Sequence, residues 1–255
     1  MITERAYPAL AKELRSHKRI GVLVSGGCDS EVLLRAAADV LGRSNTIAFN
    51  AVTPFIAKYY TDIVTATTKE LNIRLIQQEL NPMQTDDIKA NTCQRCYHCK
   101  KAIYSTIIET ATRNSITILA DGTNLDDTHE HRPGMKAAEE LHISHPFITA
   151  NMTKADIRQL GKLLNMPDPD RPSDSCLATR IPENTPITAD SLLLIEKIEQ
   201  PLRPDAKGRL RARLSGTQIT VEFQTVDKML INAHEKELRT TAKTNKHSIQ
   251  FHENT

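Results

Sequence analysis

The stretch Ile20-Gly21-Val22-Leu23-Val24-Ser25-Gly26-Gly27-Cys28-Asp29-Ser30 joins a short apolar run to a glycine turn. Directly after it, Val32, Leu33 and Leu34 have the spacing of the buried face of a helix. We therefore predict a strand, a tight turn and the start of a helix. Adjacent glycines let the backbone approach an anion closely, and the first turn of a helix offers unpaired N–H groups. The pattern indicates a pocket for phosphate.

Residues 25–30 lack the lysine of a Walker loop and the third glycine of a dinucleotide fingerprint. The pattern SGGxDS instead resembles the signature of the PP-loop ATP pyrophosphatases. This resemblance implies that ATP is cleaved between its α and β phosphates, which activates a carboxyl or carbonyl oxygen as an adenylate and releases pyrophosphate. The plain alternative is a strand-to-helix turn that needed glycine. The residues expected to bind ATP through this loop are Ser25, Gly26, Gly27, Asp29 and Ser30.

The overall composition excludes few classes of protein. The chain has 255 residues, of which 39% are hydrophobic and 25% are charged, as in an ordinary soluble protein. This length suits one large domain, or one medium domain with a small appendage. Basic residues are spread along the chain apart from a cluster at 207–213, so nucleic acid is not an expected partner. We interpret that cluster as a local anion site.

The sequence contains no apolar run of about eighteen residues, the length that could span a bilayer. Residues 1–19 carry charges throughout, so we expect a cytoplasmic protein with no membrane partner. The five cysteines are an odd number, which is poor material for a disulfide framework. Their positions favour chemistry or metal binding.

Strand-like and helix-like segments alternate through the first half of the chain. We predict strands at 19–24, 46–52, 73–79 and 116–120, with helices at 30–41 and 55–71. Strands separated by such helices imply βαβ units, so we predict an α/β fold with a doubly wound, mainly parallel sheet. The resemblance of residues 25–30 implies that this fold is of the PP-loop ATP pyrophosphatase type. Ligands bind beyond the carboxyl ends of such strands, where the glycine turn and the loop 121–127 both fall.

Five prolines from position 167 to 186 interrupt this pattern, so we predict an extended ordered loop or a linker there. Beyond it we predict a helix at 191–202, strands at 209–214 and 218–223, a helix at 226–238 and a short strand at 248–251. The expected domains are therefore a PP-loop ATP pyrophosphatase domain, 1–186, and a small α+β domain, 187–255, for substrate binding or oligomerisation.

Cys93, Cys96 and Cys99 place three thiols three residues apart. Thiolates at this spacing can bind one soft metal ion or three corners of an iron–sulfur cluster. Alternatively, Cys96 and Cys99 are small buried side chains at the start of a helix over 100–112.

Cys176 stands alone in the proline-rich loop, where Arg180 favours its thiolate. A lone loop cysteine is usually inert. However, a chain that makes acyl adenylates needs a nucleophile to receive the activated group.

Carboxylates fall beside the predicted phosphate pocket, where they can hold the magnesium ion that accompanies ATP. Alternatively, these carboxylates only stabilise turns and cap helices, which are common roles of Asp in loops. Arg211 and Arg213 are two residues apart on a predicted strand, so they share one face and can clamp a phosphate or a carboxylate. A solvated basic face is the alternative. The expected magnesium ligands are Asp29, Asp126 and Asp127, and Asp121 and Asn124 are expected to contact ATP.

Taken in order, these stretches resemble the LarE family, the ATP-dependent sacrificial sulfur transferases that help to build the nickel-pincer nucleotide of lactate racemase. The SGGxDS loop is shared across the superfamily, whereas RCYxCK and CLA(S/T)RIP in this order are much narrower. The matching stretches span nearly the whole chain: SGGCDS at Ser25, RCYHCKK at Arg95, DGTNLDD at Asp121, HRPG at His131, SCLATRIP at Ser175, and RLRARLSG followed by ITVE near Glu222.

The resemblance implies that ATP adenylates a carboxylate of pyridinium-3,5-biscarboxylic acid mononucleotide, and that the Cys176 thiolate expels AMP to give a thioester. Loss of the Cys176 α-proton and β-elimination would leave a thiocarboxylate and dehydroalanine, so each chain would act once. Lys101 is implied as a base or charge stabiliser. Arg180, Arg211 and Arg213 are implied to hold the nucleotide phosphate or the second carboxylate, and Glu199 and Glu222 to contact metal or substrate.

Three departures from the family pattern bear on this interpretation. Cys28 replaces a small apolar residue, Cys93 adds a third thiol, and Glu183-Asn184 replaces a common Tyr-Gly. The third thiol keeps open a 4Fe–4S enzyme whose cluster carries an exchangeable sulfide, on Cys93, Cys96 and Cys99 or on Cys96, Cys99 and Cys176. A second alternative is an ATP- or AMP-binding module without chemistry. The implied partners are a nucleotide-like small molecule, other proteins of nickel-pincer biosynthesis, and further copies of this chain in a homo-oligomer.

Overall fold

The computed structural model describes residues 3–129 and 133–254. The chain forms two compact units. The N-terminal unit consists of Met1–Val52, Tyr60–Leu80 and Cys96–Arg171, and the C-terminal unit consists of Thr53–Tyr59, Asn81–Arg95 and Pro172–Thr255. The predicted division between residues 186 and 187 differs from these units and stays a prediction. His131 and Arg132 of the HRPG stretch lie outside the described residues.

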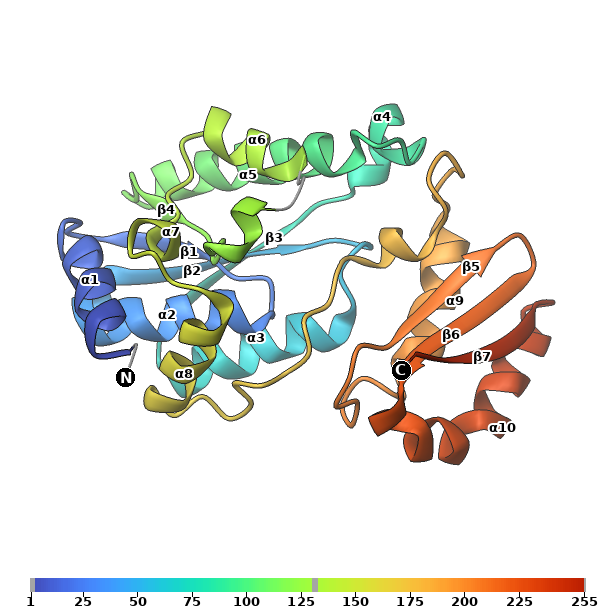
Figure 1. Cartoon of the computed structure of the whole chain (residues 1–255). Helices are drawn as coiled ribbons and strands as arrows, with labels where there is room; N and C mark the ends of the chain where they lie inside the picture. The colour runs from blue at the N-terminus through green and yellow to red at the C-terminus, as the bar shows by residue number, and fades with distance from the viewer. Residues whose placement is uncertain (1–2, 130–132, 255) are drawn as a thin grey trace. The chain divides into compact units, whose positions relative to one another are not determined.

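A four-stranded parallel sheet forms the centre of the N-terminal unit (Figure 1). Its strands are β1 (Ile20–Leu23), β2 (Thr46–Val52), β3 (Arg74–Glu79) and β4 (Leu119–Ala120). The strand order is β3-β2-β1-β4, with Val22 of β1 opposite Ala48 on one side and Ala120 on the other. The predicted parallel α/β sheet is therefore confirmed, and the glycine turn follows an inner strand.

Helices cover both faces of this sheet. They are α1 (Thr3–Arg15), α2 (Cys28–Leu41), α3 (Lys58–Glu70), α5 (Arg95–Arg113), α6 (Pro133–Glu140), α7 (Pro146–Thr149) and α8 (Lys154–Leu163). Val22 packs into a core with residues of α1, α2 and α8, whereas its neighbour Leu23 packs into a second core with residues of α5 and α6. Because successive strand residues face opposite sides of a sheet, the two cores lie on opposite faces. This is the doubly wound arrangement that the alternation predicted.

The C-terminal unit contains a three-stranded sheet with helices against it (Figure 1). Its elements are α4 (Asp86–Lys89), α9 (Ala189–Glu199), β5 (Arg211–Ser215), β6 (Gln218–Gln224), α10 (Lys228–Thr244) and β7 (Ser248–Asn254). β5 and β6 form an antiparallel hairpin, and β7 pairs with β6 in parallel. Ala212 and its partner Val221 are buried, so Arg211 and Arg213 project from the opposite face. The small α+β arrangement is as predicted.

Several element boundaries differ from the prediction for local reasons. α5 begins at Arg95 rather than at residue 100, so Cys96 and Cys99 lie in its first turns. α9 ends at Glu199 because Pro201 cannot donate a helical hydrogen bond. α10 extends beyond residue 238 to 244, where Ala242 is still buried.

Candidate functional site

The glycine turn between β1 and α2 has the geometry of an anion cradle. Gly26 has a φ of +82°, and a Cβ atom there would lie 2.4 Å from the carbonyl oxygen of Tyr60, so only glycine fits. The Ser30 hydroxyl donates to the Gly27 carbonyl oxygen (3.0 Å) and accepts from the Ser25 N–H (3.2 Å). Gly27, the N-cap residue of α2, has no side chain to cap the helix. The N-terminus of α2 can therefore receive a phosphate.

The Asp29 carboxylate has one oxygen atom with partners and one without. Asn124 Nδ2 donates to Oδ2 (3.1 Å), and Lys154 Nζ lies 3.7 Å from the same oxygen. Oδ1 is buried and has no hydrogen-bond partner among the described residues. Burial raises the pKa of Asp29, and the charge of Lys154 opposes this rise. A buried carboxylate oxygen without a partner is costly, so it indicates a place for a bound cation.

Magnesium carried by ATP fits Asp29 Oδ1, because Mg²⁺ in nucleotide sites usually contacts one or two carboxylates together with phosphates. Asp126 Oδ2 accepts from the Lys154 N–H (2.8 Å), and Asp127 Oδ2 accepts from the Asn124 N–H (3.2 Å). Nowhere in residues 3–129 and 133–254 do three His, Cys, Asp or Glu side chains gather so that they could hold a metal ion. The magnesium roles of Asp126 and Asp127 stay predictions.

Three basic side chains that sequence reasoning missed lie close to the phosphate loop. Lys154 pairs with Asp29, and Arg171 Nη2 donates to the Gly26 carbonyl oxygen (3.0 Å). Burial raises the pKa of Asp29, and the charge of Arg158 opposes this rise as that of Lys154 does; Arg158 Nε is buried without a partner in the described part of the chain. The available sequence signal was the i, i+4 spacing of Lys154 and Arg158 on one helix face. Arg171 is also paired with Glu31 (2.9 Å), so Lys154 and Arg158 are the side chains that can offer positive charge to a phosphate.

Asp121 follows β4 and is held by protein partners. Its Oδ1 lies 2.7 Å from His145 Nδ1, and its Oδ2 accepts from the Tyr104 hydroxyl (2.9 Å). Burial alone would raise the pKa of Asp121, but His145 and Lys100 hold it well below its usual range. The predicted ATP contact of Asp121 stays a prediction. Sequence reasoning also missed His145, whose Nε2 is buried without a hydrogen-bond partner in the ranges described.

Lys101 is held in an ion pair on α5. Its Nζ donates to Glu140 Oε2 (2.7 Å) and to the Tyr97 hydroxyl (2.8 Å). These two hydrogen bonds raise the pKa of Lys101, so the amine is protonated. An amine accepts a proton only in its neutral form, so the base role of Lys101 gains no support from this arrangement. Both of its implied roles stay predictions.

The thiols other than Cys176 differ in burial. Cys93 is exposed, and Cys96 and Cys99 are half-buried. Since the described side chains form no metal-binding group, the 4Fe–4S interpretation gains no support and stays a prediction.

Cys28 is buried, its Sγ donates to the Pro169 carbonyl oxygen (3.2 Å), and burial raises its pKa to about 11. Cys28 is therefore a packed thiol and a poor nucleophile.

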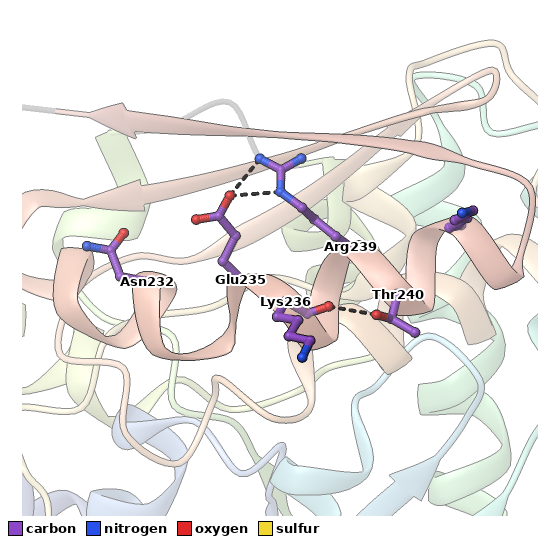
Figure 2. Close-up of a pocket in the computed structure, with 6 residues that line it drawn as sticks. Asn232, Glu235, Lys236, Arg239 and Thr240 are labelled. Carbon is purple, nitrogen blue, oxygen red and sulfur yellow. Dashed lines mark hydrogen bonds and ion pairs between the residues drawn. The ribbon is translucent and has the colours of Figure 1, made fainter.

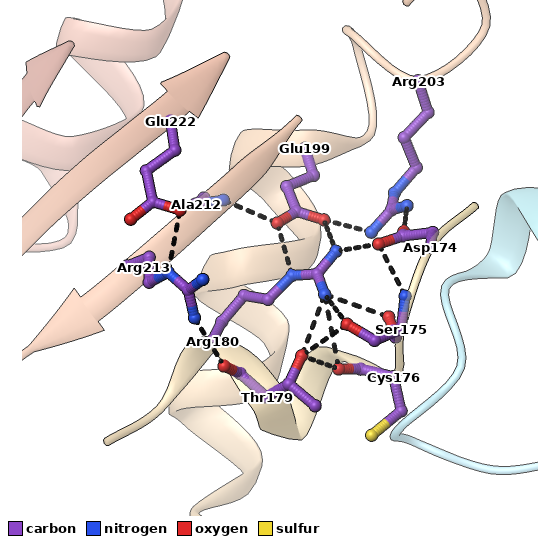
Figure 3. A network of polar contacts seen from close by, with 10 residues as sticks. All are labelled: Asp174, Ser175, Cys176, Thr179, Arg180, Glu199, Arg203, Ala212, Arg213 and Glu222. Atoms are coloured by element: carbon purple, nitrogen blue, oxygen red, sulfur yellow. Dashed lines mark hydrogen bonds and ion pairs between the residues drawn. The ribbon is translucent and has the colours of Figure 1, made fainter. Parts of the chain in front are cut away.

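Cys176 lies in the C-terminal unit, at the N-cap of the 3-10 helix η4 (Leu177–Arg180). Figure 3 shows its Sγ pointing away from the polar network that holds its backbone. The Leu177 N–H donates to the Phe55 carbonyl oxygen (2.8 Å), and Arg95 Nη1 donates to the Ala178 carbonyl oxygen (3.2 Å). These bonds fix the loop within the unit, and the Cys176 side chain is half-buried. The predicted ordered loop therefore holds this thiol in one place.

Arg180 and Glu199 lie at the centre of a buried ion-pair network (Figure 3). Their side chains are 0% exposed, with Arg180 Nε 2.9 Å from Glu199 Oε1. Arg180 also pairs with Asp174 (2.6 Å), and Arg203 pairs with both carboxylates. Glu199 further accepts from the Ala212 N–H of β5 (2.6 Å). The network ties η4 to α9 and β5, so Arg180 and Glu199 have structural partners, and their implied substrate or metal contacts stay predictions.

Replacing Arg203 by methionine is expected to lower the free energy of unfolding by about 3–5 kcal/mol, because two buried carboxylates would lose a partner. Arg113→Met is the matched control. Arg113 pairs with Glu109 (3.5 Å) at the same i, i+4 spacing, but both side chains are exposed. The control should change stability by less than about 0.5 kcal/mol. Urea unfolding measures the free energy of unfolding of both variants. An equal loss of stability in Arg203→Met and Arg113→Met would contradict the stabilising role of the buried network.

The two arginines of β5 differ in their partners. Arg213 Nε pairs with Glu222 Oε2 (2.9 Å), and Arg213 Nη1 donates to the Thr179 carbonyl oxygen (3.1 Å) (Figure 3). Arg211 Nε is buried and has no partner within the described residues. Burial and the nearby charge of Arg180 lower the pKa of Arg211. A buried guanidinium nitrogen without a partner fits an anionic ligand. The substrate contacts of Arg211, Arg213 and Glu222 stay predictions that this geometry supports.

A separate shallow pocket of about 490 Å³ lies on α10. Figure 2 shows that its side chains come from one helix, with Arg239 paired to Glu235 (2.7 Å). The residues that line it are Asn232, Glu235, Lys236, Arg239, Thr240 and Lys243. None of the predicted site residues lines this pocket.

The fold and the loop after β1 define a PP-loop α/β protein. No family model matches the chain. An uncharacterised protein of Methanocaldococcus jannaschii is 32% identical over 227 residues, which are 88% of this chain and 85% of that protein. An uncharacterised protein of Synechocystis is 31% identical over 202 residues, which are 79% of this chain and 75% of that protein.

The pyridinium-3,5-bisthiocarboxylic acid mononucleotide synthase of Lactiplantibacillus plantarum is 29% identical over 214 residues, which are 84% of this chain and 78% of that protein. The chain belongs to the LarE family, as the order of its motifs predicted. Of the helices in residues 3–129 and 133–254, none has the length and apolar content needed to cross a membrane. The cytoplasmic location stays a prediction.

Proposed function

We propose that this protein is a sulfurtransferase that uses ATP and the sulfur atom of Cys176 to convert pyridinium-3,5-biscarboxylic acid mononucleotide into its thiocarboxylate. The name of the Lactiplantibacillus plantarum relative supports sulfur transfer in the synthesis of such a thiocarboxylate. The observation that carries the proposal is the cysteine loop of the C-terminal unit. There Cys176 is held on a fixed backbone in the same unit as Arg211, whose buried Nε has no partner in the described ranges. A thiol and an anion site are what an acidic acyl substrate needs.

The first step is adenylation. The glycine turn and the N-terminus of α2 bind the ATP phosphates, and a substrate carboxylate oxygen attacks the α phosphorus as the bond to pyrophosphate breaks. Asp29 Oδ1 would hold Mg²⁺, which neutralises charge on the phosphate oxygens. Lys154 and Arg158 stabilise the charge that develops on the departing pyrophosphate.

The second stage is sulfur transfer. The Cys176 thiolate attacks the acyl carbon, AMP leaves, and a thioester forms. A base then removes the α-proton of Cys176, and the bond between Cβ and Sγ breaks. The product leaves as a thiocarboxylate, and residue 176 becomes dehydroalanine. Because the sulfur atom comes from the chain, each chain acts once.

Product stoichiometry tests this proposal. The protein is incubated with ATP, magnesium and the dicarboxylate nucleotide, and pyrophosphate and thiocarboxylate are quantified. We expect pyrophosphate release that depends on the dicarboxylate, and at most one thiocarboxylate per chain. Several thiocarboxylates per chain, with about four irons per anaerobically purified chain, would favour the 4Fe–4S alternative. If no pyrophosphate is released, the ATP- or AMP-binding module without chemistry is the alternative that remains.

Arg211→Met is expected to raise about 10- to 100-fold the concentration of dicarboxylate nucleotide that gives the half-maximal rate of a single turnover, the effect of losing a hydrogen bond to a charged group. The pyrophosphate burst at saturating substrate should change little, because ATP binds to other residues. Arg209→Met is the matched control, since Arg209 is exposed. A half-saturating concentration that is unchanged in Arg211→Met, or raised equally in both variants, would contradict an anion site at Arg211.

Two further expectations belong to the same proposal. The thiocarboxylate would pass to other proteins of nickel-pincer biosynthesis, and the chain would form a homo-oligomer. The first follows from the product and the second from the family resemblance. Analytical ultracentrifugation would test the oligomer directly.

A further inference from the structure

The backbone carbonyl oxygen of Cys176 receives three hydrogen bonds within the C-terminal unit (Figure 3). The Thr179 N–H donates at 3.0 Å, the Thr179 hydroxyl at 2.8 Å and Arg180 Nη1 at 3.5 Å. The first of these bonds is the ordinary i to i+3 bond that opens a 3-10 helix. The hydroxyl is an additional donor that helix geometry does not require. Arg180 Nη1 donates at shorter distances to the Ser175 carbonyl oxygen (3.0 Å) and Ser175 Oγ (2.8 Å), so its contribution at the Cys176 carbonyl oxygen is mainly its nearby positive charge.

Both side chains are held rigidly. The Arg180 side chain is 0% exposed and is fixed by Glu199 and Asp174. Arg180 Nη1 also donates to Thr179 Oγ1 (3.0 Å), and Ser175 Oγ lies 2.8 Å from the same oxygen. The Thr179 hydroxyl is therefore oriented by its neighbours, and it uses its own proton toward Cys176. Donors that are fixed before reaction interact strongly with a developing negative charge, because they need not reorient as the charge appears.

We propose that Thr179 and Arg180 are catalytic residues that stabilise the enolate formed at residue 176 during β-elimination, an inference that rests on the proposed function. When the α-proton of the Cys176 thioester is removed, the electron pair of the Cα–H bond moves into the Cα–C bond. The carbonyl oxygen of the same residue then carries the negative charge. This is the oxygen that Thr179 and Arg180 already contact.

The atoms and electrons of this step balance without a further reagent. A base, which is an imidazole, amine or carboxylate side chain or a water molecule, takes the α-proton. The enolate electron pair then forms the Cα=Cβ bond of dehydroalanine as the Cβ–Sγ bond breaks. The thiocarboxylate leaves with the electrons of that bond, so nothing is oxidised or reduced overall.

The three donors assist this step more than the preceding ones. The carbonyl oxygen of Cys176 is nearly neutral in the thioester and becomes an oxyanion only when the α-proton is lost. Hydrogen bonds to it therefore strengthen in the transition state of elimination, which accelerates that step. Adenylation and thioester formation take place at the substrate carboxylate and at Sγ. These earlier steps do not place charge on the backbone carbonyl.

The test replaces Thr179 by valine, which keeps the shape and removes the hydroxyl donor. Intact-protein mass spectrometry then follows the thioester and the dehydroalanine forms in a single turnover. We expect elimination about 100-fold slower, the typical effect of removing one oxyanion donor, with an unchanged pyrophosphate burst and accumulation of the thioester. Thr179→Ser keeps the hydroxyl and is expected to eliminate at close to the wild-type rate.

Thr240→Val is the matched control. The Thr240 hydroxyl donates to the Lys236 carbonyl oxygen at 2.8 Å, the same bond type and length, but on the exposed face of α10 (Figure 2). It is expected to leave every step unchanged. Thr179→Ala is made in parallel, so that a packing defect in the valine variant does not decide the result.

Three outcomes separate the inference from the function on which it rests. Wild-type protein that forms dehydroalanine, with Thr179→Val and Thr179→Ala forming it equally fast, would overturn the enolate role alone. Variants that lose the pyrophosphate burst and the thioester together with elimination would also overturn it, because the defect would precede the enolate. Wild-type protein that forms neither thioester nor dehydroalanine would overturn the proposed function itself.

Discussion

Cys176→Ala is expected to abolish thiocarboxylate formation while pyrophosphate release that depends on the dicarboxylate continues. The thiol is the proposed sulfur source and lies in the C-terminal unit, whereas the phosphate loop lies in the N-terminal unit. Loss of the side chain removes the nucleophile without touching a hydrogen bond of Arg180 or Thr179, since these contact the backbone of residue 176. Product analysis by mass spectrometry and a pyrophosphate assay measure the two activities separately.

Cys93→Ala is the control for this experiment, because Cys93 is an exposed thiol for which the proposal has no role. It should give one thiocarboxylate per chain, as wild type does. Product formed by Cys176→Ala would contradict the sacrificial mechanism. Loss of product in Cys93→Ala with retention of pyrophosphate release would instead favour sulfur carried by a cluster.

Asp29→Asn is expected to lower pyrophosphate release about 100-fold and to raise the magnesium concentration required for it. The buried Oδ1 is the proposed magnesium contact, and the amide of asparagine binds this cation less strongly than a carboxylate. Folding should not suffer. Burial raises the pKa of Asp29, so the folded protein binds that proton more tightly than the unfolded chain does, and the carboxylate costs stability above its unfolded-state pKa.

Asp170→Asn is the matched control. Asp29 pairs with Lys154 (3.7 Å) and Asp170 pairs with Lys162 (2.8 Å), and both lysines belong to α8. Asp170 is 58% exposed, so its replacement should leave the magnesium dependence unchanged. At neutral pH, the Tm of Asp29→Asn should be no lower than that of wild type. An unchanged magnesium titration in Asp29→Asn would rule out a magnesium contact at this carboxylate.

The sheet of the N-terminal unit was predictable because its inner strands are nearly continuous apolar runs separated by helical segments. The positions of β1 and β2 follow directly from burial on both faces. The bounds of β4 were harder to predict, since the strand is only two residues long. Its residue Ala120 also forms an isolated parallel bridge with Ser144. That pairing joins residues far apart in the sequence, and no local pattern shows it.

Residues of the candidate site could be predicted only where they lie within one short sequence motif. The turn around Gly26 and the thiol of Cys176 could be selected from their local sequence. The pairing of Arg180 with Glu199 could not, because a sequence does not show which charges neutralise one another. The same holds for Lys154 and His145, which meet Asp29 and Asp121 through tertiary contacts.

In the proposed mechanism, the sulfur atom of the product comes from Cys176 of the chain itself. Whole-protein mass spectrometry after incubation with ATP, magnesium and the dicarboxylate nucleotide tests it most directly. We expect the chain to lose the mass of H₂S, and peptide mapping to place dehydroalanine at position 176. Thiocarboxylate formed by a chain of unchanged mass would contradict the account.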